Sequence, residues 1–283
     1  MSIQKIGVIG AGTMGNGIAQ VCALAGLQVT MIDISEEAVQ RGLKTLAGSL
    51  ERLVKKEKLT ADDKVATLAR VHGATDYAAL KAVDLVIEAA TENVELKLRI
   101  LKQIDELVSA ETVIATNTSS ISITQLAAVV KCPERFIGMH FFNPVPLMAL
   151  LELICGLQTS EQTHARMLAF AQQIGKTPIT VRNSPGFVVN RILVPMINEA
   201  IFVLNEGLAT AEDIDAGMKL GCNHPIGPLA LADMVGLDTL LAVMQVFYEG
   251  FNDPKYRAAP LLKELVAAGR LGRKSGRGFY TYE

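Results

Sequence analysis

One histidine and one glutamate stand in neighbouring apolar runs of the chain, a pattern that suits acid–base chemistry. His140 lies in Gly138-Met139-His140-Phe141-Phe142-Asn143-Pro144, and Glu152 follows twelve residues after it in Leu151-Glu152-Leu153. If the two runs are strands that pair as neighbours, the carboxylate can orient the imidazole and stabilise its protonated form, which produces a general base. A lone histidine in an apolar run is more often a hydrogen-bonded core residue, so its position in the fold must decide.

A nucleotide-binding pattern opens the chain. The apolar strand Ile6–Ile9 runs directly into Gly10-Ala11-Gly12-Thr13-Met14-Gly15, and the chain from Ile18 to Ala25 has helical character. Glycines at this spacing, between a strand and a helix, permit a tight turn and allow pyrophosphate to approach the helix N-terminus.

An acidic residue then specifies the dinucleotide. A second strand over residues 28–32 ends in Asp33, which lies 23 residues after Gly10. An acid at about this distance accepts hydrogen bonds from the adenosine ribose and repels a 2′-phosphate. We therefore predict NAD rather than NADP as the cofactor. The alternative, that Asp33 is an ordinary helix cap, explains less of the pattern.

Two helices then interrupt the strand–helix alternation. The first is predicted from Glu36 to about Lys58, and a shorter one begins at Thr60. At 1.5 Å per residue the first helix is roughly 35 Å long, so it should project beyond the sheet. Ser49, Arg52 and Lys56 share one of its faces. Such a charged run is most simply a solvated face, but beside a nucleotide site it suggests a large anionic group on the substrate.

Polar clusters follow two further predicted strands, residues 83–88 and 112–115. They are Thr91-Glu92-Asn93 with Lys97, and Thr116-Asn117-Thr118-Ser119-Ser120. Strands that alternate with helices predict a parallel sheet, and ligands bind at the carboxyl ends of its strands. The clusters can also serve as helix caps. Because the next strand brings His140 to the same edge, its position favours catalysis over core filling.

The second half of the chain is predicted to be helical. A last strand over residues 179–181 precedes Ser184-Pro185-Gly186, where Ser184 is expected to cap a helix from Gly186 to Glu206 that carries Asn190 in its second turn. The prediction is an α/β chain: a Rossmann-type parallel sheet domain with a projecting helical hairpin, residues 1–184, followed by an all-α C-terminal domain, residues 185–283. The broad apolar faces of the later helices predict a cleft wall and a dimer interface.

Composition excludes several classes of protein. The 283 residues carry a net charge of −2, which gives no electrostatic reason to expect nucleic acid. No apolar run reaches the roughly 18 residues that span a bilayer. The N-terminus shows no signal peptide pattern, and the four cysteines and four histidines show no metal-ligand spacing. We expect a cytoplasmic protein with reduced thiols and no bound metal.

The motifs resemble those of a known family. Gly10–Gly15, Ala115-Thr116-Asn117-Thr118-Ser119-Ser120, Gly138–Pro144 and Ser184-Pro185-Gly186-Phe187-Val188-Val189-Asn190-Arg191 occur in the order found in the L-3-hydroxyacyl-CoA dehydrogenases, and the resemblance runs from Ile6 to Tyr282. The compact length is similar to that of the stand-alone bacterial 3-hydroxybutyryl-CoA dehydrogenases. The resemblance implies a Rossmann-type domain with a helical hairpin and a helical dimerisation domain.

The resemblance also implies roles for particular residues. His140 corresponds to the catalytic base and Glu152 to its partner, while Ser119 and Asn190 contact the reacting oxygen and the thioester end of the substrate. Ser49 and Lys56 match positions that hold coenzyme A. The implied NAD contacts, besides the glycine motif, are Asp33, Glu92, Lys97, Ser119, Asn143 and Lys274.

The resulting hypothesis is reversible, NAD-dependent oxidation of an (S)-3-hydroxyacyl-CoA, with 3-hydroxybutyryl-CoA as the expected substrate, by a homodimer. One alternative is a dehydrogenase of small free 3-hydroxy acids, which would need no basic helix. Another is a non-catalytic NAD-binding protein, which would have no use for the pair of His140 and Glu152. The acyl-chain length and the direction of the reaction stay open at this stage.

Overall fold

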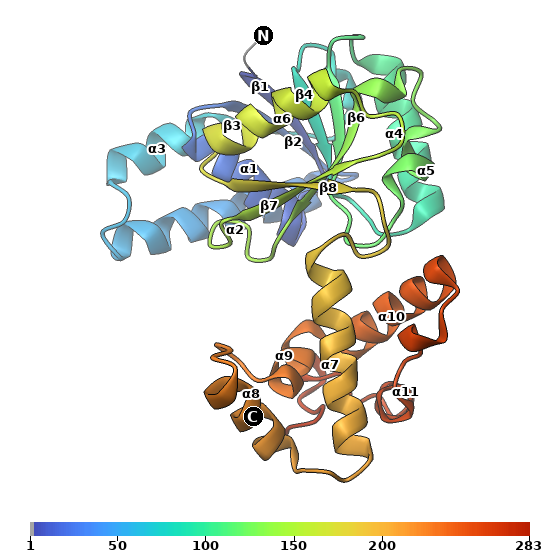
Figure 1. Cartoon of the computed structure of the whole chain (residues 1–283). Coiled ribbons are helices and arrows are strands. Elements are labelled where there is room, and N and C mark those ends of the chain that lie inside the picture. Colours follow the sequence, from blue (N-terminus) through green and yellow to red (C-terminus); the bar gives the residue numbers. More distant parts are fainter. Residues whose placement is uncertain (1–2) are drawn as a thin grey trace. The chain divides into compact units, whose positions relative to one another are not determined.

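The computed structural model describes residues 3–283, which divide into two compact units. The first unit ends at Asn183 and the second comprises Ser184–Glu283. The first holds every strand, whereas the second is built of helices (Figure 1).

The first unit is organised around an eight-stranded sheet with the order β3-β2-β1-β4-β5-β6-β7-β8. All neighbouring strands are parallel except β6 and β7, which pair antiparallel. The predicted α/β architecture is thus confirmed. The strands are β1 Lys5–Ile9, β2 Gln28–Ile32, β3 Val71–Ala74, β4 Leu85–Glu88, β5 Val113–Thr116, β6 Phe136–Phe141, β7 Leu150–Cys155 and β8 Thr177–Arg182.

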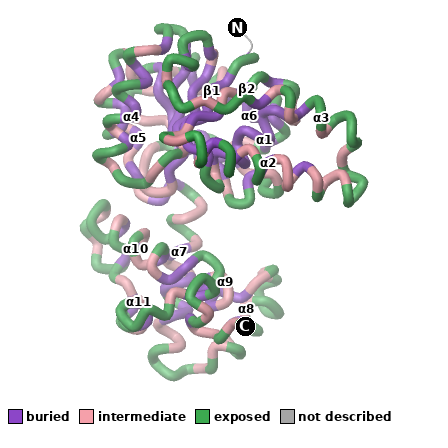
Figure 2. Tube along the Cα trace, turned by 180° about the vertical axis from the view of Figure 1, so that it is seen from behind, coloured by how far each residue is buried: buried purple, intermediate pink, exposed green. Residues whose placement is uncertain are grey.

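Helices cover both faces of this sheet and bury its central strands, whereas the edge strands β3 and β8 are partly exposed (Figure 2). Apolar side chains of α1 (Thr13–Leu24), α2 (Glu36–Lys55) and α6 (Glu161–Gln173) share one core cluster with alternate strand residues. On the opposite face, α5 (Ile123–Ala127) packs on Gly138, and α4 (Val94–Leu107) contacts α5 and the 3-10 helix η1 (Tyr77–Leu80). Burial on two faces explains why the strands read as continuous apolar runs.

The predicted helical hairpin is present and projects beyond the sheet (Figure 1). Its arms are α2 and α3 (Ala61–Ala69), and the side chains of Ser35 and Thr60 cap their N-termini. The first arm ends at Lys55, three residues before the predicted end, because Glu57 adopts a left-handed conformation with φ of 56°.

The second unit is helical, as predicted, around a core of residues such as Ile201, Leu240 and Phe247. Its first helix begins later than the sequence suggested. Ser184 is not the N-cap, since Gly186 and Phe187 have left-handed φ values of 73° and 54° that interrupt a helix, and Asn190 falls in the first turn rather than the second. The unit contains α7 Val189–Asn205, α8 Ala211–Gly221, α9 Pro228–Val235, α10 Leu237–Phe251, η3 Pro254–Tyr256, α11 Pro260–Ala267 and η4 Arg273–Ser275, while η2 Pro133–Arg135 belongs to the first unit.

Several large apolar side chains of the second unit are exposed, among them Ile192, Leu208 and Leu220. Such side chains suit the dimer interface expected from the sequence, which stays a prediction.

Across residues 3–283 no single helix is long and apolar enough to cross a bilayer; the pair α9 and α10, bent by 97°, meets the length and composition test only when taken together.

A buried ion pair links α4 to the segment that precedes β6. Arg135 donates from Nη2 to Asp105 Oδ1 at 2.5 Å and from Nη1 to the carbonyl of Thr112 at 3.0 Å. The backbone N–H of Lys131 donates to the other oxygen of Asp105. Both charged side chains are buried, so the guanidinium depends on this carboxylate for its neutralisation.

Replacing Asp105→Ala should therefore lower the free energy of unfolding by about 3–5 kcal/mol, because the guanidinium is left buried without a counter-charge. Urea denaturation followed by circular dichroism measures the change. Glu106→Ala, which removes an exposed carboxylate from the neighbouring position of α4, is the control and should leave the unfolding midpoint unchanged. Equal midpoints for the two variants would contradict the role given to the pair.

Candidate active site

The centre of the candidate site is a hydrogen bond between two strands. The antiparallel pairing of β6 and β7 sets His140 directly opposite Glu152, and Nδ1 of the ring lies 2.6 Å from Oε2 of the carboxylate. The Glu152 side chain is fully buried and that of His140 is 7% exposed. When an ionised carboxylate accepts this hydrogen bond, Nδ1 of the ring carries the proton and Nε2 carries the lone pair.

Neighbouring residues hold the imidazole in place. The ring of Phe142 packs on it with centroids 4.5 Å apart. The backbone N–H of Phe141 donates to the side-chain oxygen of Asn117 at 2.9 Å, and Asn117 in turn donates its own N–H to the carbonyl of Glu88 at 2.7 Å. Asn117 thus continues the junction of β5 and β6 beyond the last paired residues and fixes the chain next to His140.

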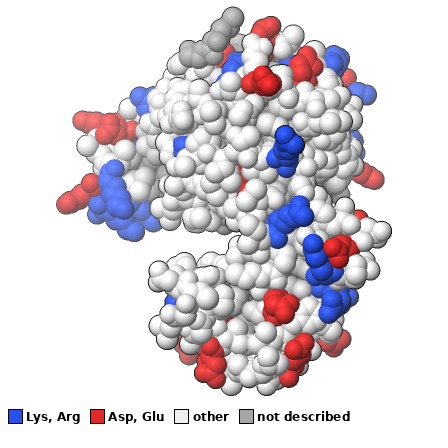
Figure 3. Space-filling model, viewed as in Figure 1, with Lys and Arg blue, Asp and Glu red and all other residues white. Residues whose placement is uncertain are grey.

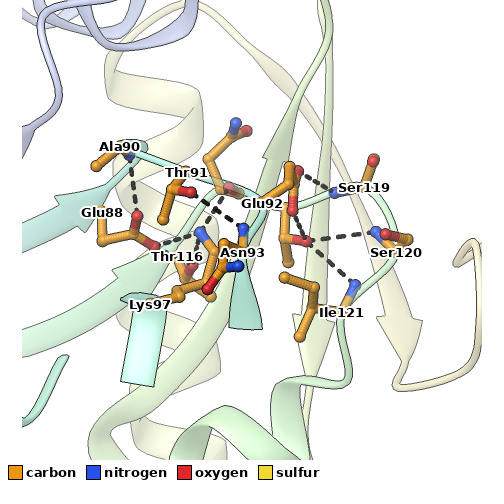
Figure 4. A network of polar contacts seen from close by, with 12 residues as sticks. Glu88, Ala90, Thr91, Glu92, Asn93, Lys97, Thr116, Ser119, Ser120 and Ile121 are labelled. Carbon is orange, nitrogen blue, oxygen red and sulfur yellow. Dashed lines mark hydrogen bonds and ion pairs between the residues drawn. The ribbon is translucent and has the colours of Figure 1, made fainter. Parts of the chain in front are cut away.

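A buried ionic network lies under the same edge of the sheet (Figure 4). The ammonium of Lys97 contacts Glu88 Oε2, the hydroxyl of Thr116 at 3.1 Å and the carbonyl of Asn117 at 3.3 Å. Glu88 also accepts from the Thr116 hydroxyl at 2.7 Å and from the backbone N–H of Ala90 at 2.9 Å. Lys97 and Glu88 are fully buried, so Lys97, which the resemblance assigns to cofactor contact, here ties the ends of β4 and β5 together.

Glu92 orders the loop that carries Ser119. Its carboxylate accepts from the Thr118 hydroxyl at 2.7 Å and from the backbone N–H of Ser119 at 3.1 Å (Figure 4). The Thr118 hydroxyl oxygen also accepts from the N–H of Ile121 at 3.1 Å. These bonds hold Ser119, which is partly exposed, at the carboxyl end of β5.

The glycine motif between β1 and α1 fits a dinucleotide. Gly10 has a φ of +98°, and a Cβ there would lie 2.7 Å from the carbonyl oxygen of Ala89. A Cβ at Gly15 would lie 1.7 Å from the carbonyl oxygen of Gly10, so helix and strand pack closely only without it. A Cβ at Gly12 would meet nothing within 4 Å, which leaves the N-terminus of α1 open to a phosphate.

The carboxylate of Asp33 lies beside the glycine motif. Oδ2 accepts from the N–H of Ala11 and Oδ1 from that of Ile34, each at 2.7 Å. Two hollows, of about 420 and 550 Å³, share Asp33 and Ile34 in their walls. Each carboxylate oxygen keeps a lone pair that can accept from a hydroxyl group. The acceptors and the space therefore suit the adenosine part of NAD.

The proposed coenzyme A residues, Ser49 and Lys56, lie on α2 and at its C-terminal cap. Basic side chains gather where this helix ends (Figure 3). Glu51 of the same helix is paired with Lys64 of α3 at 2.6 Å, and that hydrogen bond lowers the pKa of Glu51. Glu51 is thus engaged with α3, and Lys56 is exposed to solvent.

Three assigned residues are not part of the hydrogen-bond networks described above. Asn143 is exposed and is the second residue of the loop after β6, just before the cis peptide bond to Pro144. Asn190 and Lys274 belong to the second unit, where Lys274 Nζ donates to Asp238 at 2.7 Å and lowers the pKa of Asp238. The approach of Asn190 and Lys274 to the first unit stays a prediction.

Sequence reasoning assigned no role to Glu88, although it joins Lys97 to Thr116. A signal was present, since Glu88 is an ionisable residue at the end of an apolar strand, where ligand sites of parallel sheets lie. Its partner could not be foreseen, because Lys97 is presented by the next helix and only its packing shows which way the ammonium points.

Comparisons with known proteins identify the family of the chain. A family model described as the 3-hydroxyacyl-CoA dehydrogenase NAD binding domain matches residues 5–184, and the model of the C-terminal domain of the same enzymes matches residues 186–282. The chain is 50% identical over 283 residues to the probable 3-hydroxybutyryl-CoA dehydrogenase of Bacillus subtilis (strain 168), covering 100% of this chain and 99% of the relative.

Solved structures show the same likeness. The crystal structure of (S)-3-hydroxybutyryl-CoA dehydrogenase from Ralstonia eutropha is similar with a TM-score of 0.98 and 68% identity, and a structure from M. tuberculosis with a TM-score of 0.97 and 44% identity; in both cases the match covers 100% of each chain. The predictions of the family and of NAD as cofactor are thereby confirmed. The chain belongs to the 3-hydroxyacyl-CoA dehydrogenase family and is an NAD-dependent oxidoreductase.

Proposed function

We propose that the protein catalyses the reversible oxidation of (S)-3-hydroxybutyryl-CoA to acetoacetyl-CoA. The names of the relatives support this substrate. The observation that carries the proposal is the hydrogen bond between His140 and Glu152 at the carboxyl edge of the sheet. That edge also carries the glycine motif and Asp33, so acid–base chemistry and dinucleotide binding meet in one place.

The proposed base is His140. With its proton on Nδ1, the ring accepts the substrate hydroxyl proton at Nε2 during oxidation and returns it during reduction. The carboxylate of Glu152 offsets the positive charge that the ring then carries. When bound, NAD would accept the hydride that leaves the carbon bearing the hydroxyl group.

Two residues are proposed to stabilise the reacting oxygen. Ser119, whose loop is ordered by Glu92, presents a hydroxyl donor from the end of β5. Asn190, near the start of α7, presents an amide donor from the second unit. Donors aimed at an oxygen on which charge develops lower the barrier, because they need little rearrangement during the reaction.

Other residues are proposed to hold the two nucleotides. Asp33 accepts from the adenosine ribose of NAD, and Glu92, Asn143 and Lys274 contact the rest of the cofactor. The buried ammonium of Lys97 holds the end of β5 in place by donating to the Thr116 hydroxyl and to the carbonyl of Asn117. For coenzyme A, Ser49 and Lys56 bind the phosphate end, which explains why a basic arm extends beyond the sheet.

The substrate class is tested by NADH oxidation with three substrates: acetoacetyl-CoA, the acetoacetyl thioester of N-acetylcysteamine, and free acetoacetate. We expect rapid turnover of acetoacetyl-CoA, a higher KM for the truncated thioester, and no turnover of the free acid. Binding energy from the nucleotide part of coenzyme A accounts for the difference between the two thioesters.

Lys56→Ala tests the proposed coenzyme A contact in the same assay, with the truncated thioester as the control substrate. It should raise the KM for acetoacetyl-CoA several-fold and leave the KM for the truncated thioester unchanged. Turnover of free acetoacetate with an efficiency similar to that of the thioesters would contradict the proposed substrate class. Binding of NADH without turnover of any of the three would instead favour a non-catalytic protein.

The base is tested by His140→Gln. This change should lower turnover of acetoacetyl-CoA by roughly 10²–10⁴-fold, the usual contribution of a general acid–base group, and leave the affinity for NADH unchanged. Steady-state rates and NADH fluorescence titration measure the two effects. His72→Gln, at an exposed histidine of β3, should behave as wild type. Near-normal turnover by His140→Gln would remove His140 from the mechanism.

A further inference from the structure

The loop between the two strands of the proposed dyad is long. It comprises the eight residues 142–149, between the end of β6 at Phe141 and the start of β7 at Leu150. Hairpin loops of two to five residues fix their strands through the turn itself, whereas a loop of this length needs other contacts to hold one conformation. It also carries Asn143, three residues after His140.

A buried lysine supplies such contacts. Lys176 lies between α6 and β8, is 7% exposed, and donates from Nζ to the carbonyls of Val145 at 2.5 Å and Met148 at 2.7 Å. One ammonium thus ties together two points of the loop that lie three residues apart. Backbone bonds add to this, because the N–H groups of Leu147 and Met148 donate to the carbonyl of Pro144.

The charge of Lys176 is compensated by these carbonyl dipoles. Throughout residues 3–283 no carboxylate forms an ion pair with it. The neighbouring thiol of Cys22 is neutral, since burial raises the pKa of Cys22 to about 12. Burial lowers the pKa of Lys176 from its usual value. A cation kept in such surroundings is costly, so its two acceptors must be well placed.

The loop also packs on the helix that begins at the glycine motif. A Cβ at Gly17 of α1 would lie 2.9 Å from Cβ of Val145, which shows how closely the two segments approach. The N–H of Thr177, next to Lys176, donates to the carbonyl of Ala149 at 2.8 Å. The loop is therefore held between α1 on one side and the start of β8 on the other.

We propose that Lys176 is a positioning residue for the dehydrogenase reaction: by holding Val145 and Met148 it fixes the loop that carries Asn143 and joins His140 to Glu152. The inference rests on the proposed function, because it assigns Lys176 an effect on hydride transfer. A displacement of about 1 Å at reacting groups can cost roughly 10²-fold in rate, so a loosened loop should slow the chemical step.

The test compares Lys176→Met with wild type in single-turnover reduction of acetoacetyl-CoA by NADH, at a temperature where circular dichroism shows both proteins folded. We expect the hydride-transfer rate of the variant to fall at least about tenfold, with a smaller change in the KM for acetoacetyl-CoA. Lys102→Met, at an exposed lysine of α4, removes the same charge and should react as wild type.

A spectroscopic measurement separates positioning from stability. The proton shared between His140 Nδ1 and Glu152 should give a downfield proton NMR signal, assigned by its loss in His140→Gln. We expect this signal to shift or broaden in Lys176→Met and to be unchanged in Lys102→Met. A purely structural lysine would lower the melting temperature and leave both the signal and the rate of the folded protein unaltered.

Wild-type hydride transfer by folded Lys176→Met would overturn the inference while the proposed function stands. If Lys176→Met does not fold, Lys176→Gln, which keeps an uncharged donor, takes its place, and a wild-type rate again overturns it. Failure of the wild-type protein to reduce acetoacetyl-CoA would contradict the proposed function instead. In that case an unaltered His140 signal in the Lys176 variant would still reject the positioning role.

Discussion

The hydrogen bond between His140 and Glu152 is the interaction on which the proposed chemistry depends, and it exists only because of strand register. The antiparallel pairing of β6 and β7 sets the two residues opposite each other. A slip of one residue would turn Glu152 to the other face of the sheet. Because Glu152 is fully buried, its charge also needs a hydrogen-bonded partner, so fold stability and site geometry impose the same requirement.

The rest of the first unit keeps that register in place. Asn117 joins β5 to the chain beside His140, and Glu88 with Lys97 joins the ends of β4 and β5. These contacts are buried, whereas Ser119 and Asn143 on the following loops are partly or fully exposed. A rigid, hydrogen-bonded polar layer thus supports the more accessible residues that are proposed to contact substrate and cofactor, which is the arrangement that preorganised sites require.

Local patterns predicted much of this structure. Three features can be recognised from short stretches of sequence, each about thirty residues long. They are the glycine motif, the acid at Asp33 and the alternation of strands and helices, and the structure contains all three. Contacts between residues far apart in the sequence were harder to predict. Whether His140 and Glu152 face each other depends on the pairing of two strands. The bonds of Lys176 to the loop between these strands depend on the packing of α6, which precedes Lys176 in the chain. At Ser184-Pro185 the helix-start pattern failed because Gly186 and Phe187 adopt left-handed conformations.

The most direct test of the account is the single-turnover rate of hydride transfer in Glu152→Gln. The carboxamide keeps the shape of the side chain, but its NH₂ group can donate to Nδ1, which shifts the ring proton to Nε2 and leaves no acceptor for the substrate hydroxyl. The account predicts a fall in rate of roughly 10²-fold or more with unchanged affinity for NADH. A rate equal to that of the wild-type protein would show that the pairing of His140 with Glu152 does not drive the reaction.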